Sequence, residues 1–245
     1  MRPIVIGTRG SPLAMRQTGL VRTALEARFP DRQFSVRTIK VQADQKPETP
    51  LEALGGEGIF VRELETALVE GAIDLAVHSL KDLTLETPAP LRIAAVLERD
   101  DPRDALVSRA GGGLDRLPEG ARVGTSSLRR RSQLLRRRPD LQPEGIRGNV
   151  DTRLRKLDEG HYDAIVLAAC GLIRLGLKER ITEYLDFSWM LPEPGQGALA
   201  IETRAEDDEM CRIAASVEDP STRACVEAER SFLLALGGGC RVPIA

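Results

Sequence analysis

The stretch IVIGTRGSP, residues 4–12, contains the two kinds of element from which we expect the fold to be built. Its first three residues are β-branched and predict a short buried strand, which Gly7 to Gly10 interrupt. Ser11 followed by Pro12 is typical of a helix start, with the hydroxyl as the N-cap and proline at the first helical position. Free backbone N–H groups collect at such a corner, so Arg9 and Ser11 are candidates for binding an anion.

The alternation of strands and helices continues through the first hundred residues. Strands are predicted at 34–41, 73–78 and 91–97, with a helix at about 60–70. In an open α/β sheet the functional site lies at the carboxyl ends of such strands, and Lys81 and Asp82 follow the strand at 73–78 directly. They are candidates by position, although an ordinary surface ion pair explains the same two residues equally well.

The corner of residues 4–12 is repeated later in the chain. A strand at Arg122–Gly124 leads into Thr125, Ser126 and Ser127 and then into a helix. The first turn of that helix carries Arg129, Arg130 and Arg131, where positive charge opposes the helix dipole. An anionic ligand would justify this unfavourable placement.

Further arginines lie at the ends of predicted elements. Asn149 is expected to cap a helix, with Arg147 just before it and Arg153 about one turn inside. Arg174 follows a buried strand predicted at 164–168. The run Arg136–Arg138, by contrast, is interpreted as a solvated helical face.

Two breaks flank this second block of strands and helices. One is the charged stretch at 98–104 and the other is the proline- and glycine-rich stretch at 191–198. We therefore predict that residues 103–192 form a second domain, inserted into a first domain that consists of residues 1–98 with 198–217.

Composition limits the class of ligand. The 245 residues include 35 basic and 37 acidic residues, for a formal charge of −2, and only 3 % are aromatic. A nucleic-acid-binding protein would be expected to have a basic surplus and aromatic residues among the basic ones, and both are missing. No P-loop pattern is present, and four cysteines without a C-x-x-C pair, with two histidines, make a metal site improbable. Arginines at helix ends then favour a small ligand with many carboxylates or phosphates, bound in a cleft between two domains.

The segment GGGCRVP, residues 237–243, is the last unusual feature of the chain. Its glycines permit any turn and leave space around Cys240, whose thiolate the adjacent arginine would favour. A helix C-cap followed by a small apolar residue accounts for the same segment, so the residues alone leave both interpretations open.

Six segments in this order resemble the signature motifs of the hydroxymethylbilane synthase (porphobilinogen deaminase) family. They are TRGSPLA at 8–14, AVHSLKD at 76–82, GTSSLRR at 124–130, RGNV at 147–150, PGQGA at 194–198 and GCRVP at 239–243. The resemblance implies two domains similar to periplasmic anion-binding proteins, with residues 219–245 as the start of a small third α/β domain. It also implies a transferase of tetrapyrrole and haem biosynthesis, which deaminates four porphobilinogen molecules, joins them head to tail and releases hydroxymethylbilane with water.

The resemblance assigns roles to particular residues. It implies a dipyrromethane cofactor attached to Cys240 as primer, and Asp82 as the catalytic carboxylate that stabilises the electron-poor azafulvene left when ammonia departs. The implied cofactor-binding residues are Lys81, Asp82, Ser127, Arg129, Arg130, Arg147 and Arg153. The implied substrate-binding residues are Arg9, Ser11, Arg147, Arg153 and Arg174.

The chain departs from the family pattern in two places. Glu57 stands where the family usually has a lysine, and Ala53 where a further lysine can occur. The family also continues beyond residue 245, so we expect a chain that is either cut short or naturally short. No signal peptide or membrane-spanning run is apparent, and we expect a cytoplasmic monomer that binds neither membrane nor nucleic acid. The competing hypothesis is a non-catalytic two-domain anion-binding protein, which would have no use for Cys240 beside three glycines.

Overall fold

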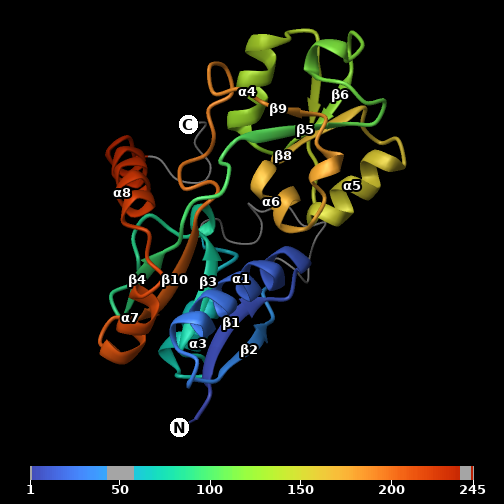
Figure 1. The fold of residues 1–245 in the computed structure, drawn as a ribbon. Coiled ribbons are helices and arrows are strands. Elements are labelled where there is room, and N and C mark those ends of the chain that lie inside the picture. Colours follow the sequence, from blue (N-terminus) through green and yellow to red (C-terminus); the bar gives the residue numbers. More distant parts are fainter. Residues whose placement is uncertain (1, 43–57, 238–243, 245) are drawn as a thin grey trace. The chain divides into compact units, whose positions relative to one another are not determined.

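The computed structural model describes residues 2–42, 58–237 and 244. These residues divide into two compact units, one of residues 2–99 with 198–237 and the other of residues 100–197 with 244. Each unit consists of a five-stranded mixed sheet covered by helices (Figure 1). The predicted α/β class is therefore confirmed.

The sheet of unit 1 has the strand order β2-β1-β3-β10-β4. Its strands are β1 (Ile4–Arg9), β2 (Phe34–Ile39), β3 (Leu75–Ser79), β4 (Leu91–Val96) and β10 (Leu199–Arg204). The first three run parallel, whereas β10 lies antiparallel between β3 and β4. The late strand β10 thus completes a sheet that begins almost two hundred residues earlier.

Helices cover both faces of this sheet because side chains along each strand alternate between the faces. Ile4 and Ile6 pack with α1 (Pro12–Arg28) and α7 (Asp208–Ala215), whereas Val5 packs with α3 (Arg62–Val69) on the other face. Gly7 is a point of close approach, since a Cβ there would lie 2.2 Å from the Cδ1 atom of Ile73. The stretch at 4–12 forms the predicted strand and helix, and Ser11 Oγ accepts the N-capping hydrogen bond from the Ala14 backbone N–H at 3.3 Å.

The sheet of unit 2 has the order β7-β6-β8-β5-β9 and the same pattern of directions. Its strands are β5 (Asp104–Ser108), β6 (Arg122–Gly124), β7 (Gln142–Glu144), β8 (Ala164–Ala168) and β9 (Glu183–Tyr184). Strands β7, β6 and β8 are parallel, and β5 lies antiparallel between β8 and β9. The repeated corner noticed in the sequence therefore belongs to a repeated sheet topology.

Helix α4 (Leu128–Arg137) covers one face of the second sheet, and α5 (Val150–Asp158) with α6 (Ala169–Arg174) covers the other. Short 3₁₀ helices occur at η2 (Leu80–Asp82), η3 (Leu114–Arg116) and η4 (Lys178–Arg180). Strands β7 and β9 were not predicted, because each is a two- or three-residue edge strand with polar residues and no apolar alternation.

The last helix, α8 (Pro220–Ala235), is capped by Asp219, whose Oδ1 accepts from the Thr222 backbone N–H at 2.7 Å. It packs on unit 1 through Val226, which lies in the core cluster that includes Leu80 and Ala198. Glu229 of the same helix pairs with Arg99 at 2.5 Å. The third domain beginning at residue 219 stays a prediction.

Candidate active site

In unit 1 the structure brings together the predicted site residues of the first corner, Arg9 and Ser11, and those that follow β3, Lys81 and Asp82. Because β1 and β3 are parallel neighbours, Arg9 at the end of β1 and Asp82 just after β3 lie at the same edge of the sheet. Arg9 Nη1 is 3.9 Å from Asp82 Oδ2, and the Arg9 guanidinium lies over the Phe60 ring, 4.3 Å from its centroid. Asp82 keeps 31 % of its side chain exposed, so its carboxylate remains accessible.

Lys81 precedes Asp82 in η2, and Ser11 begins α1 beside the end of β1. Ser11 is buried with its hydroxyl engaged as the helix cap, whereas Lys81 is partly exposed. Unit 1 therefore offers a partly exposed carboxylate next to Arg9, at a sheet edge that also carries Lys81 and the N-terminus of α1, and this combination is suited to holding an anion next to a reacting centre.

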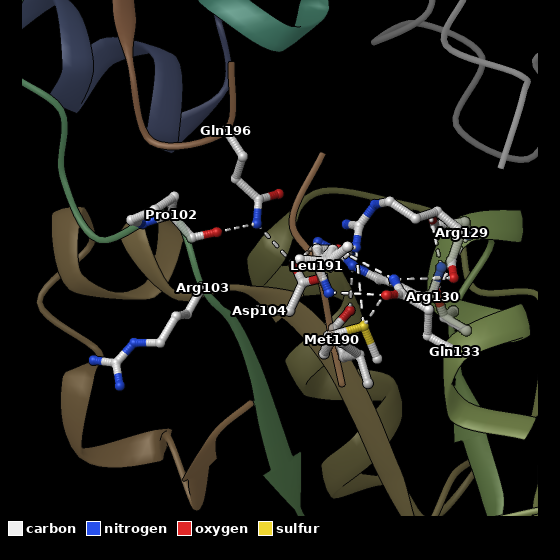
Figure 2. A network of polar contacts seen from close by, with 12 residues as sticks. Pro102, Arg103, Asp104, Arg129, Arg130, Gln133, Met190, Leu191 and Gln196 are labelled. Carbon is white, nitrogen blue, oxygen red and sulfur yellow. Dashed lines mark hydrogen bonds and ion pairs between the residues drawn. The ribbon is translucent and has the colours of Figure 1, made fainter. Parts of the chain in front are cut away.

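In unit 2 the predicted arginines converge on a carboxylate that the sequence analysis missed. Asp104, the first residue of β5, is fully buried, and its Oδ2 accepts from Arg129 Nη1 at 2.8 Å while its Oδ1 accepts from Arg130 Nη2 at 2.7 Å. Figure 2 shows these side chains meeting together with Gln196, whose Nε2 donates to Asp104 Oδ1 at 2.9 Å. Burial alone would raise the pKa of Asp104, but the charges of Arg130 and Arg129 outweigh it and hold that pKa well below its usual range.

The sequence carried one signal for Asp104. A carboxylate at the start of an apolar strand, as in Asp104-Ala105-Leu106-Val107, needs a buried cationic partner. What it could not indicate is which arginines supply that partner. Ser127, also predicted as a site residue, caps α4 by accepting from the Arg130 backbone N–H at 3.4 Å.

Arg147 and Arg153 add positive charge to the same unit. Arg153 Nε donates to the Gly148 carbonyl at 2.8 Å. Burial and the neighbouring charges of Arg130 and Arg147 lower the pKa of Arg153 to about 10. Repulsion between neighbouring cations in a folded protein indicates an anion-binding site, because a bound anion would reduce that repulsion.

Arg174 lies at the C-terminal end of α6, with 4 % of its side chain exposed. Its Nε donates to Asp100 Oδ2 at 2.7 Å and its Nη2 to the Gly197 carbonyl at 2.6 Å. Arg174 is therefore held by protein partners, and the ligand-binding role assigned to it stays a prediction.

A polycarboxylate fits the donors that unit 2 presents. Nε and Nη2 of Arg129 and Nε of Arg130 are buried and have no hydrogen-bond partner among the described residues. Guanidinium N–H groups in this state are suited to carboxylate oxygens, which accept two bonds from one arginine. Cys240 and Glu57 lie outside the described residues.

Two other properties of the described chain bear on the kind of site. The described part contains no group of three His, Cys, Asp or Glu residues that could hold a metal ion. Within the same ranges no helix combines the length and the apolar composition needed to cross a bilayer.

Comparison with known proteins identifies relatives along the whole chain. Residues 4–212 match the family model described as porphobilinogen deaminase, dipyromethane cofactor binding domain. A porphobilinogen deaminase of Syntrophobacter fumaroxidans is 50 % identical over 243 residues, which are 99 % of this chain and 79 % of the relative. One from Roseiflexus castenholzii is 53 % identical over 241 residues, 98 % of this chain and 80 % of the relative.

Solved structures give a likeness in fold alone. A periplasmic substrate-binding protein of an ABC transporter from Coxiella burnetii has a TM-score of 0.52 at 14 % identity, covering 94 % of this chain and 97 % of that one. The VFT2 domain of Bordetella pertussis BvgS, a double mutant, has a TM-score of 0.51 at 17 % identity, covering 94 % and 91 %. The expected resemblance to periplasmic binding proteins is confirmed at the level of fold.

Proposed function

Because the chain belongs to the porphobilinogen deaminase family, we propose that it is a transferase that builds hydroxymethylbilane from four porphobilinogen molecules on a dipyrromethane primer. Each porphobilinogen loses ammonia, and its methylene carbon forms a bond to the α-carbon of the preceding pyrrole, which gives up a proton. Water releases the finished tetrapyrrole for haem and porphyrin biosynthesis.

The observation that supports this function best is the excess of positive charge in unit 2. Two buried guanidinium groups pair with the carboxylate of Asp104, and the pKa of Arg153 is lowered to about 10 by burial and by Arg130 and Arg147. Each pyrrole of the substrate carries an acetate and a propionate. A product that grows in negative charge suits a site whose cations are only partly neutralised.

Asp82 is the proposed catalytic carboxylate. Departure of ammonia leaves positive charge spread over the methylene carbon and the pyrrole nitrogen. A carboxylate fixed at the end of β3 and within 3.9 Å of Arg9 Nη1 stabilises that charge without reorganising. Arg9 holds the Asp82 carboxylate in place and, with Ser11 and Arg174, binds the carboxylates of the incoming substrate.

The proposed cofactor contacts are those that the family motifs imply. The residues proposed to hold the dipyrromethane are Lys81, Asp82, Ser127, Arg129, Arg130, Arg147 and Arg153, and Cys240 is its proposed point of attachment. When bound, dipyrromethane supplies the pyrrole α-carbon to which the first substrate unit is joined. The residues of this chain orient its carboxylates.

We further propose that the protein acts as a monomer in the cytoplasm. The cytoplasmic location is supported by the three described cysteines, Cys170, Cys211 and Cys225, which are free thiols, as expected in a reducing compartment.

Intact-mass measurement tests the proposal. The chain is expected to carry an adduct of the size of a dipyrromethane, which disappears in Cys240→Ser but persists in the control Cys225→Ser, a change at an exposed free cysteine. Asp82→Asn is expected to keep the adduct and lose most of the consumption of porphobilinogen. An unmodified chain that does not consume porphobilinogen would instead indicate a non-catalytic anion-binding protein.

A further inference from the structure

We propose that Asp104 is a positioning residue, held by Gln196, that fixes Arg129 and Arg130 for binding the carboxylates of the pyrrole chain. This inference rests on the proposed function. It assigns a role to a buried carboxylate and to the PGQGA motif at 194–198.

The first support is the direction from which the two arginines come. Arg129 and Arg130 are consecutive residues in the first turn of α4, and consecutive side chains on a helix point about 100° apart. Both nevertheless end on one carboxylate, at 2.8 and 2.7 Å from its two oxygens. Asp104 is thus the group that brings the two guanidinium groups together.

The second support is how firmly Asp104 is itself held. Asp104 pairs with Ala168 of β8, and its backbone carbonyl accepts from the Leu185 N–H, just after β9, at 2.8 Å, so its backbone is held from both sides. Gln196 is fully buried, and its Nε2 donates to Asp104 Oδ1 at 2.9 Å and to the Pro102 carbonyl at 2.7 Å. The Gln196 amide thus links the Asp104 carboxylate to the backbone just before β5 (Figure 2). This link keeps the carboxylate in place when the arginine side chains move.

The third support is that the group keeps buried donors without acceptors. Arg129 and Arg130 have 4 % and 8 % of their side chains exposed and both donate to Asp104, while the charge of Glu193 also acts on Arg130. Arg129 Nη1, which donates to Asp104, also donates to the Leu191 carbonyl at 2.5 Å, and Arg130 Nη1 donates to the Val166 carbonyl at 3.2 Å. An ion pair serving the fold alone is expected to satisfy all of its buried donors.

Three donors remain: Nε and Nη2 of Arg129 and Nε of Arg130 have no partner among the described residues. Because these N–H groups are shielded from water, an acceptor that reaches them has little competition from solvent. The carboxylates of the pyrrole chain supply such acceptors. Asp104 therefore occupies one edge of the arginine pair and leaves the other donors to the ligand.

The test compares three variants by the fraction of chains carrying the adduct, the KM for porphobilinogen and the melting temperature. In Asp104→Asn we expect the adduct-bearing fraction to fall about tenfold, since a misplaced pair of binding groups commonly costs that much or more. The control is Asp140→Asn, which breaks another ion pair of unit 2, that with Arg138 at 2.7 Å. It should lower the melting temperature and leave the adduct-bearing fraction unchanged.

Asp104→Glu separates positioning from charge. It keeps the negative charge, so most of the melting temperature lost in Asp104→Asn should return. Its extra methylene moves both guanidinium groups, so the adduct-bearing fraction should stay low or the KM of loaded chains should rise. If Asp104→Asn does not fold, Asp104→Glu alone still tests the inference.

The outcomes are distinguishable. Parental loading and KM in Asp104→Asn or Asp104→Glu would overturn the inference while leaving the proposed function intact. Loss of adduct in proportion to melting temperature in all three variants, Asp140→Asn included, would reduce Asp104 to a structural role. An unloaded parent chain would overturn the proposed function and this inference together.

Discussion

Replacing Arg153 with methionine is expected to stabilise the fold of the cofactor-free protein while impairing its loading. Arg153 is surrounded by like charges, and burial together with Arg130 and Arg147 lowers its pKa to about 10. A base whose pKa is lower in the folded than in the unfolded state costs stability wherever it is protonated. That cost is fully present below about pH 10 and disappears as the pH rises toward the unfolded value.

The magnitude follows from the pKa. The pKa of Arg153 falls from the ordinary arginine value to about 10, and at about 1.36 kcal/mol per pKa unit this shift corresponds to roughly 3 kcal/mol. Methionine retains much of the aliphatic volume but loses the 2.8 Å hydrogen bond from Nε to the Gly148 carbonyl, worth about 1 kcal/mol. A net gain of about 1–2 kcal/mol remains, which would raise the melting temperature by about 2–8 °C in a chain of this size.

The assay is thermal unfolding of the Cys240→Ser background, which keeps the covalent cofactor out of the comparison. Arg155→Met is the matched control, because Arg155 lies on the same helix, is 63 % exposed and pairs with Glu159 at 2.9 Å. It should change the free energy of unfolding by less than about 0.5 kcal/mol. The gain from Arg153→Met should shrink when a polycarboxylate such as citrate occupies the site. A melting temperature lowered by several degrees in Arg153→Met would refute the reasoning.

Two further predictions concern the fold. Asp74, 2 % exposed, has a pKa that burial raises but that the hydrogen bond from Arg2 and its other partners bring below the usual range. Its stabilisation is therefore present above about pH 4 and lost as the pH falls through the lower folded pKa. Asp74→Asn should cost roughly 1–3 kcal/mol in urea unfolding at pH 7 and much less at pH 3; an equal cost at both pH values would contradict this. Gly148 has a φ of 107°, and a Cβ there would lie 2.6 Å from Thr152 Cγ2, so Gly148→Ala should cost about 1–3 kcal/mol. Gly19→Ala, within α1 and with nothing within 4 Å of the added Cβ, should instead stabilise by about 0.5–1 kcal/mol, and a reversed order of the two variants would disprove the argument.

Local chemistry made much of the fold predictable. The N-cap at Ser11, followed by proline, forms as expected, and Asp219 caps α8 in the same way, because a cap involves only a hydroxyl or carboxylate and the next few N–H groups. Buried strands such as β8 were recognisable from an unbroken apolar run. The sequence placed Arg9 and Asp82 each just at or after the end of a strand, and their proximity followed once β1 and β3 proved to be parallel neighbours.

The sequence by itself thus determined the alternation of strands and helices, the resemblance in motifs and the positions of the arginines at helix ends. Only the tertiary structure decided that β10 enters the first sheet between β3 and β4, and that Asp104 receives both Arg129 and Arg130. Asp104 and Gln196 are 92 positions apart, and no periodicity spans that distance. Such pairs depend on which strands become neighbours in the sheet. That arrangement is set by the packing of both sheet faces, which involves residues far apart in the sequence.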